Sequence, residues 1–412
     1  MYKTIFPILF LLAVTTATAR ADFFVSINGS DGDPGTREEP FATLERAREA
    51  VREMKPQAVA GEAIHVWLRE GNYVLREPLE FTPRDSGTPD SPIIYAAHGG
   101  EEVTLSGGTN IEGWKHIEGN LWKTQLPAGK AGEWYFRQLF ADGRRLTRAR
   151  IPNEGYLYTE GPLSKYAEPD KRRHGWNYSV IGGMRKNQPE VFCGFSFKPG
   201  DIHAWENYKD AEVITYHSWE CSWQTIREID SENNDVYFNT PCRYPVGFFS
   251  DHARYRIENI PSALDEAGEW YLNRETGELS YLAHAGQDPR SMEFVAPRLK
   301  RFLTLRGEAE RQKFVEHIEF RDITFRYARY PMGIYDVAPD WPEPARKAHG
   351  DWSENFPPGY TDSQASPRCG QAIDLIAARN CIFRDCEVSH VGAYAISLGR
   401  DCHNNTVYGC HL

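Results

Sequence analysis

Cys381-Ile-Phe383-Arg-Asp-Cys386-Glu-Val388 is the middle one of three copies of an eight-residue pattern near the end of the chain. In this pattern two alternating strand pieces, each apolar at its first and third positions, are joined by two residues. The second piece therefore begins one residue out of phase, and a phase shift at the same place in every copy predicts a corner. The other copies are Ile318-Glu-Phe320-Arg-Asp-Ile323-Thr-Phe325 and Asn405-Thr-Val407-Tyr-Gly-Cys410-His-Leu412.

The spacing of the copies predicts a parallel β-solenoid. The second copy begins at Cys381 and the third at Asn405, and Ala372-Ile-Asp-Leu375 is echoed at almost the same interval by Ala395-Ile-Ser-Leu398. A period in the twenties with two or three short strands per turn is typical of such folds, and we expect a right-handed parallel β-helix. Equivalent residues of successive coils then lie about 4.8 Å apart. Cys386 and Cys410 are expected to be neighbours in an interior ladder, packed as reduced thiols.

The first hundred residues fit the same fold. A helix that begins near Thr43 places Leu44, Ala47 and Val51 on one face, and we expect it to cap the first coil. Strand pieces follow at 64–68, 79–81, 93–95 and 103–105.

From residue 107 to about 288 the period fails, and short strands alternate with turn signals such as Asp142-Gly143 and Thr276-Gly277. This alternation predicts an antiparallel β-sandwich inserted into the solenoid. The predicted division is a signal peptide at 1–21, the cap and first coils at 22–108, the inserted sandwich at 109–290 and further coils at 291–412.

A long excursion is expected between residues 336 and 368. The interval from Phe320 to Phe383 is too long for two coils and too short for three, and six prolines in the excursion exclude a regular element. The segment is rich in aromatic and charged side chains, among them Asp351 and Trp352. It either lines a cleft or packs over the solenoid.

Composition restricts the function classes. The 412 residues include 47 basic and 58 acidic side chains, a net charge of -11, and 13% aromatic residues. Such aromatic content excludes a disordered chain, and the acidic balance argues against nucleic acid as a partner. Flat aromatic faces suit sugar rings, so a polysaccharide or oligosaccharide is the expected partner.

The segment 1–21 has the features of a signal peptide. Lys3 precedes an apolar stretch at 5–14, and Ala19-Arg-Ala21 is a small-x-small cleavage site. The stretch is shorter than the roughly 20 residues that cross a bilayer, and no later run is longer, so we expect no membrane span and a secreted or periplasmic protein cleaved near Ala21. None of the eight cysteines has zinc-finger spacing, and we assign neither a metal nor a cofactor.

Several segments resemble known families. Residues 24–36 with Pro40-Phe-Ala-Thr-Leu-Glu-Arg-Ala-Arg48, and also Gly71-Asn-Tyr73 and Leu105-Ser-Gly-Gly108, are similar to pectin-lyase-like β-helix enzymes. Residues 137–153 with Gly268-Glu-Trp-Tyr-Leu272 resemble glycoside hydrolase family 141 and its relatives. That resemblance implies a β-helix with an inserted β-sandwich and fucosidase or xylanase activity. It also implies further coils carrying the principal acids beyond Leu412, so we expect the chain to be a fragment.

Glycoside hydrolysis needs two carboxyl groups that flank the bond. Asp374 and Glu387 are the candidate catalytic acids because both are expected to point outward from the coils, although either could equally be a solvated residue of a sheet face. The predicted substrate contacts are His390, Tyr394, Trp352 and Asp351.

Two other functions remain open. One is a polysaccharide lyase on the same fold, which would use a Lys or Arg base and a calcium ion. The sequence has no Asp cluster at coil spacing that would hold calcium, which argues against the lyase. The other is a non-catalytic carbohydrate-binding protein that uses the aromatic excursion alone.

Overall fold

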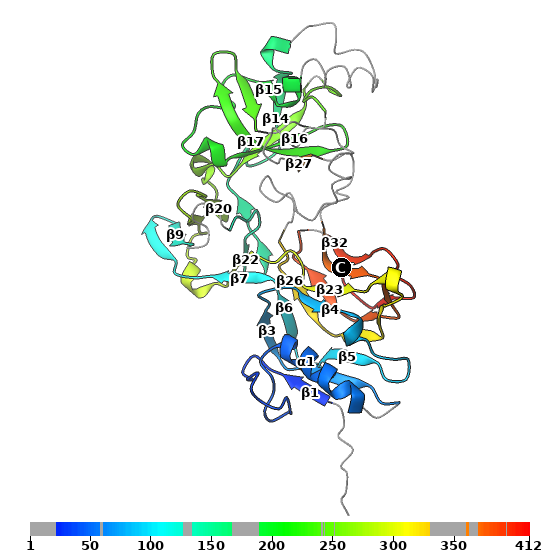
Figure 1. The fold of residues 1–412 in the computed structure, drawn as a ribbon. Coiled ribbons are helices and arrows are strands. Elements are labelled where there is room, and N and C mark those ends of the chain that lie inside the picture. The colour runs from blue at the N-terminus through cyan, green and yellow to red at the C-terminus, as the bar shows by residue number, and fades with distance from the viewer. Residues whose placement is uncertain are drawn as a thin grey trace, which may run out of the picture.

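The computed structural model describes residues 22–57, 61–126, 134–166, 189–239, 242, 244–250, 252–329, 360–361, 370–392 and 394–412. Strands dominate these residues, and the α-helix among them is α1 (Leu44–Met54) (Figure 1). The predicted all-β class is confirmed.

The chain passes in turn through three parallel sheets, which we name A, B and C. Sheet A contains β1 (Asp22–Val25), β2 (Ile64–Leu68), β5 (Ile93–Ala97), β25 (Ile318–Arg321), β30 (Ile382–Arg384) and β33 (Thr406–Tyr408). Sheet B contains β3 (Gly71–Val74), β6 (Val103–Ser106), β26 (Thr324–Arg326) and β31 (Glu387–Ser389). Sheet C contains β4 (Leu79–Phe81), β23 (Leu303–Arg306), β28 (Gln371–Ile376) and β32 (Tyr394–Leu398).

The register of these sheets follows the sequence repeat. Phe383 pairs with Phe320 of the preceding copy on one side and with Val407 of the following copy on the other. Ile373 pairs with Ile396, its counterpart in the echoed segment. Residues of successive copies therefore lie side by side on adjacent parallel strands.

The predicted corner lies between sheets A and B. Its fifth repeat position is Asp322, Asp385 and Gly409 in the three copies, and each has a left-handed backbone with φ of 56°, 52° and 66°. Asp and Gly adopt this conformation more readily than most residues, which explains how a short turn redirects the chain from sheet A into sheet B.

Stacked apolar side chains fill the space between the three sheets. The ring of Phe320 stacks on Tyr95 at a centroid distance of 5.4 Å and on Phe383 at 5.2 Å, each pair coming from adjacent strands of sheet A. Cys386 is buried in the same core and Cys410 packs against it. The seven cysteines in the described part of the chain are free thiols, as predicted for Cys386 and Cys410.

Helix α1 begins where the sequence predicts. The hydroxyl of its N-cap residue, Thr43, accepts a hydrogen bond from the backbone N–H of Arg46 at 3.1 Å. The buried residues of the helix are Leu44, Ala47, Ala50 and Val51, and they join the core of the parallel sheets.

Removing the N-cap hydroxyl of Thr43 should destabilise the protein measurably. We expect Thr43→Ala to lower the free energy of unfolding by about 1 kcal/mol, because a first-turn N–H loses its acceptor. Urea titration followed by circular dichroism measures the change. Thr43→Ser keeps the hydroxyl and serves as the control; equal stability of the two variants would show that the cap contributes nothing.

A region of mostly antiparallel pairing extends from Gly108 to Pro297, beyond the predicted boundary at 290. Strand β12 is an exception, because it pairs parallel with β20. A small sheet contains β11 (Arg144–Arg145), β10 (Phe140–Ala141), β22 (Phe294–Pro297) and β7 (Gly108–Ile111). A second contains β12 (Thr147–Arg148), β20 (Glu269–Leu272), β21 (Glu278–Leu282), β9 (Leu121–Gln125) and β8 (Lys115–Glu118).

The remaining strands of this region close on themselves. The closed antiparallel ring, which we name the barrel, runs through β19 (Arg254–Glu258), β14 (Leu157–Gly161), β15 (Gly194–Phe197), β18 (Asp235–Phe238), β17 (Cys221–Asp230) and β16 (Glu212–Tyr216), and β16 pairs back to β19. Strand β13 (Arg150–Ile151) adds to β19.

The barrel differs from the two-layer sandwich expected of this region. The long strand β17 pairs with β16 along its first half and with β18 along its second, and the register shifts between Ile226 and Glu228. Such a bulge bends a strand, so β17 takes part in both halves of the ring.

Candidate functional site

Two long additions leave the parallel sheets at the same corner. The chain between β6 and β23 contains all the antiparallel strands from β7 to β22, and the chain between β26 and β28 contains the predicted excursion. Both connections run from sheet B to sheet C. In the next turn, the same connection from β31 to β32 is only residues 390–393.

Backbone hydrogen bonds hold these connections together. The N–H of Leu299 donates to Gly107 at 2.8 Å and that of Arg329 donates to Leu299 at 2.6 Å. The N–H of Gly392 donates to Ala328 at 3.0 Å. We name this edge, marked by Gly107, Leu299, Ala328, Arg329 and Gly392, the B–C corner.

The excursion also contacts the barrel. Its strand β27 (Tyr360–Thr361) pairs antiparallel with β17, with Tyr360 opposite Trp223 and Thr361 opposite Ser222 (Figure 1). The chain therefore runs from the B–C corner to the barrel and back to sheet C. Asp351 and Trp352, the predicted substrate contacts of the excursion, lie outside the described residues.

Glu387 lies on β31 beside the corner and is held by an arginine of the adjacent strand. Arg326 donates from Nη2 to Glu387 Oε1 at 2.9 Å and from Nε to Ser389 Oγ at 3.1 Å. Hydrogen bonds from Ser389 and Arg326 lower the pKa of the Glu387 carboxyl, although partial burial opposes them. Glu387 is therefore ionised at neutral pH.

His390 follows Ser389 at the corner and contacts the inserted strands. Its ring stacks on Phe140 of β10 at a centroid distance of 4.8 Å and lies 5.4 Å from the ring of Tyr327. Burial, and then the charge of Arg326, lowers the pKa of His390, so the imidazole is neutral at pH 7. A neutral imidazole can both donate and accept a hydrogen bond.

Asp374 lies on β28 of sheet C. It is in register with Thr304 of β23 and Ser397 of β32, and it is only 2% exposed. Arg306 is its ion-pair partner, at 3.7 Å between Nη2 and Oδ2. The Arg306 side chain is 56% exposed, so this ion pair joins a buried carboxylate to a guanidinium in contact with solvent.

Tyr394 begins β32 at the end of the short corner connection. It pairs with Gln371 of β28, and 46% of its surface is exposed. An exposed tyrosine at this position presents an aromatic face beside the end of sheet C.

The structure groups the predicted residues in two places. Glu387 and His390 lie together at the end of sheet B, whereas Asp374 and Tyr394 lie on sheet C. The two acids are therefore on different sheets, each with its own arginine.

Four residues of these two places were not predicted from the sequence, namely Arg326, Ser389, Arg306 and Phe140. A signal for the first two was present, because the equivalence of Phe325 and Val388 in the repeat places Arg326 opposite Ser389. Nothing in the local sequence pairs Phe140 with a histidine so much later in the chain.

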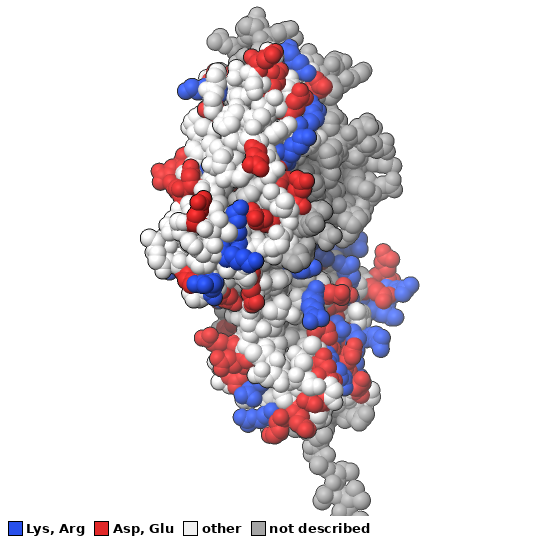
Figure 2. All heavy atoms as spheres, turned by 90° about the vertical axis from the view of Figure 1, so that its left-hand side faces the viewer, with Lys and Arg blue, Asp and Glu red and all other residues white. Residues whose placement is uncertain are grey.

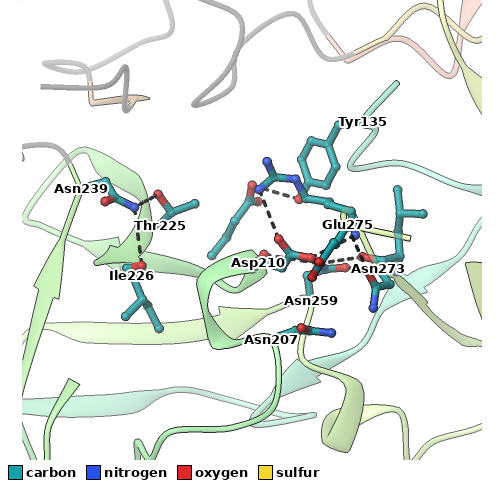
Figure 3. A network of polar contacts seen from close by, with 12 residues as sticks. Tyr135, Asn207, Asp210, Thr225, Ile226, Asn239, Asn259, Asn273 and Glu275 are labelled. Atoms are coloured by element: carbon teal, nitrogen blue, oxygen red, sulfur yellow. Dashed lines mark hydrogen bonds and ion pairs between the residues drawn. The ribbon is translucent and has the colours of Figure 1, made fainter. Parts of the chain in front are cut away.

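A third acidic centre lies between the barrel and the sheet of β12 and β20. Glu212 on β16 accepts hydrogen bonds from Tyr135 Oη at 3.1 Å, Arg137 Nε at 2.8 Å and Arg148 Nη1 at 2.7 Å. Glu258 of β19 is directly opposite Glu212. Figure 3 shows the neighbouring part of this network, in which Tyr135 lies above Asp210 and Asn259.

The two glutamates have opposite pKa shifts. Burial disfavours the charged Glu212, but Arg137 and Arg148 outweigh it and lower its pKa to about 2. Burial raises the pKa of Glu258. Opposed shifts can mark an acid–base pair, yet Glu212 is 0% exposed and its oxygens are occupied by protein donors. We therefore infer that this centre stabilises the contact between the barrel and the sheet of β12 and β20.

Charged groups are interleaved on the surface. Figure 2 shows acidic and basic side chains alternating over one face of the molecule, with no broad area of one sign. In the part of the chain that the structure describes, no three His, Cys, Asp or Glu side chains are grouped closely enough to hold a metal ion. The helices of the same residues include none with the length and apolarity needed to span a bilayer.

Comparison with known proteins identifies the fold. No protein-family model matches the chain. A solved structure titled "Glycoside hydrolase" matches 95% of this chain with a TM-score of 0.69 and 22% sequence identity. This chain spans 65% of the length of that solved chain. The likeness shows a shared fold.

Two curated proteins share shorter segments. YwoF of Bacillus subtilis, named an uncharacterized protein, is 40% identical over 84 residues, which are 20% of this chain and 15% of YwoF. Pectate lyase PEL9 of Emericella nidulans is 34% identical over 95 residues, which are 23% of this chain and 20% of PEL9.

Proposed function

We propose that the protein is a carbohydrate-active enzyme that hydrolyses glycosidic bonds in the backbone or side chains of plant or algal polysaccharides. The shared fold with a protein named a glycoside hydrolase supports this class. The location of the site is inferred from one observation: the two long additions leave the coils at the B–C corner, beside Glu387 and His390.

The finer architecture belongs to the same proposal. Sheets A, B and C are the coils of a right-handed parallel β-helix capped by α1, and residues 108–297 are a domain inserted between two coils. The protein is a relative of glycoside hydrolase family 141, and residues 1–21 direct its export.

The proposed mechanism uses two carboxyl groups. Glu387 is ionised and held by Arg326, which suits a base or an electrostatic stabiliser of developing positive charge on the sugar. Asp374 is the other carboxyl, and its closed position favours strong electrostatic interactions. His390 and Tyr394 contact the sugar in this proposal, and Asp351 and Trp352, which lie outside the described residues, stay predicted substrate contacts.

A lyase is the second candidate because of the segment shared with a pectate lyase. It would remove the proton beside a uronate carboxylate and leave an unsaturated sugar. Arg306 and Arg326 are the basic side chains nearest the candidate acids.

Product analysis separates these functions. The purified protein is incubated with plant and algal polysaccharides, and the soluble products are examined for reducing ends and for the ultraviolet absorbance of unsaturated uronates. We expect reducing ends without unsaturation. Unsaturated products would identify a lyase, and retention on the polysaccharide without any product would identify a binding protein.

Tyr394 should contribute mainly to substrate binding. We expect Tyr394→Ala to raise KM by about two- to tenfold with little change in kcat, because loss of an aromatic contact costs about 0.5–1.5 kcal/mol. Steady-state kinetics on a soluble oligosaccharide measure both constants. Tyr158→Ala, which removes a tyrosine of similar exposure (52%) from the barrel, is the control; an equal effect of the two would contradict a contact at Tyr394.

A further inference from the structure

A pocket of about 200 Å³ opens at one end of the barrel, among residues that the proposed hydrolysis does not use. Its lining includes Tyr216, His217, Phe249, His252 and Arg254. Binding sites for drug-sized ligands are usually about 300–1,000 Å³. A pocket of this smaller size matches one sugar ring better than a stretch of polysaccharide chain.

Arg254 and Tyr216 of the pocket lining belong to a cluster of two arginines and two tyrosines, completed by Arg256 and Tyr156. The guanidinium of Arg254 lies 4.9 Å from the ring centre of Tyr156 and 5.7 Å from that of Tyr216. The guanidinium of Arg256 lies 5.2 Å and 5.6 Å from the same rings. The rings of Tyr156 and Tyr216 pack edge to face, with 5.1 Å between their centroids. Interleaving of this kind holds both guanidiniums in place without neutralising them.

Among the residues that the structure describes, Arg254 and Arg256 form no ion pair with a carboxylate. The charge of Arg256 does act on the buried Glu258, whose pKa it lowers against the effect of burial, so Arg254 is the arginine of the two that faces the pocket without such a neighbour. This contrasts with Arg326 and Arg137, which are both paired with glutamates. Two positive charges held in place beside a pocket of an acidic protein are an attractive site for an anion.

Two histidines add further polar groups to the pocket. His217 is 8% exposed, and burial lowers its pKa to about 4, so it is neutral at pH 7. Its Nε2 lies 3.0 Å from Ser222 Oγ. His252 Nδ1 lies 2.8 Å from the backbone oxygen of Thr159 and donates to it, and this contact does not use Nε2. Imidazole nitrogens can form hydrogen bonds with sugar hydroxyls.

We propose that the barrel pocket binds one anionic sugar residue, bearing a carboxylate or a sulfate, as an accessory site separate from the B–C corner. Arg254 binds the anion, Tyr216 and Phe249 present their rings to the sugar, and the histidines accept or donate hydrogen bonds to its hydroxyls. The site gives the enzyme a second binding contact with an acidic polysaccharide. This role in polysaccharide binding rests on the proposed function, whereas the binding of an anionic sugar to the pocket does not depend on it.

Paired single-ring probes test the site. Binding to the full chain is measured by ligand-observed NMR with methyl α-D-galacturonide and with methyl α-D-galactoside, which has a neutral group in place of the carboxylate. Galactose 6-sulfate distinguishes the two anions. We expect at least one anionic probe to bind at least fivefold more tightly than the neutral one, and added salt to reduce the difference.

Arg254→Met tests the assignment to this pocket. It keeps a long side chain against the tyrosines but removes the charge, so we expect the preference for the anionic probe to disappear and Arg254→Lys to restore part of it. Arg290→Met is the control, since Arg290 also lies over an aromatic ring, that of Trp122, but is paired with Asp288 far from the pocket. Hydrolysis of a short neutral oligosaccharide should not change in either variant.

Equal binding of the charged and neutral probes would overturn the proposal, as would an unchanged preference in Arg254→Met. A wild type that prefers the anionic probe but hydrolyses no polysaccharide would instead contradict the proposed function alone. The two failures are therefore distinguishable.

Discussion

Asp374→Asn is expected to lower the rate of glycan hydrolysis by about 1,000-fold. Replacing a catalytic carboxyl by an amide of the same shape removes proton transfer or charge stabilisation, and such groups contribute about 10²–10⁴-fold. The change should not affect folding strongly, because the partner of Asp374 is Arg306, whose side chain is 56% exposed. Solvent keeps that guanidinium hydrated when the carboxylate is absent.

Initial rates on a defined oligosaccharide, with the melting temperature measured in parallel, test this prediction. Ser397→Ala is the matched control because Ser397 occupies the same row of sheet C on the next strand. We expect the control to keep most of the activity. Full activity in Asp374→Asn would remove this residue from the mechanism and leave Glu387 without its proposed partner.

Glu212→Gln is expected to destabilise the protein by about 3–5 kcal/mol. The substitution removes the carboxylate that is shared by Arg137 and Arg148, whose side chains are only 7% and 4% exposed. Arg148 then keeps its longer ion pair with Glu258, at 3.7 Å. Glu278→Gln is the control, since the ion pair of Glu278 with Lys123 is partly exposed and should contribute at most about 1 kcal/mol. Urea titrations give both values, and similar losses in the two variants would contradict the role of the buried network.

The same carboxyl predicts a dependence of stability on pH. The pKa of Glu212 is about 2 in the folded protein, against an ordinary value of 4.5. A lowered folded-state pKa stabilises the protein above pH 4.5, and this stabilisation is lost as the pH falls from 4.5 toward 2. The wild type should therefore lose stability more steeply than Glu212→Gln across this range. Parallel acid titrations of the two proteins would contradict the assignment.

The strands of the three parallel sheets could be predicted because their information is local. The phase shift at Asp322 and Asp385 and the spacing of Phe320, Phe383 and Val407 specify corners and neighbours directly, and the observed register follows them. Helix α1 was predictable for a similar reason, since Thr43 and the apolar face of the helix lie within a few residues of one another.

The barrel could not be predicted in the same way. Its closure depends on the pairing of β16 with β19, which are separated along the chain by β17 and β18, and on a bend within β17. Neither leaves a period in the sequence. The network around Glu212 is equally non-local, because its donors Arg137 and Arg148 come from well before the barrel strand that carries the glutamate.

The candidate site was predictable only in part. The repeat placed Glu387 in its middle copy, which ends at Val388, and His390 follows that copy by two residues, directly after β31. The contact of His390 with Phe140 and the pairing of β27 with β17 depend on how the additions fold back. The B–C corner therefore emerges only from the three-dimensional structure.

Whether the region beside the B–C corner cleaves glycosidic bonds is tested most directly by mass spectrometry of the products released from plant and algal polysaccharides by the wild type and by Asp374→Asn. We expect saturated oligosaccharides from the wild type, with one water added per bond cleaved, and a loss of about 1,000-fold in the variant. No products from the wild type, or equal yields from both proteins, would contradict the proposal.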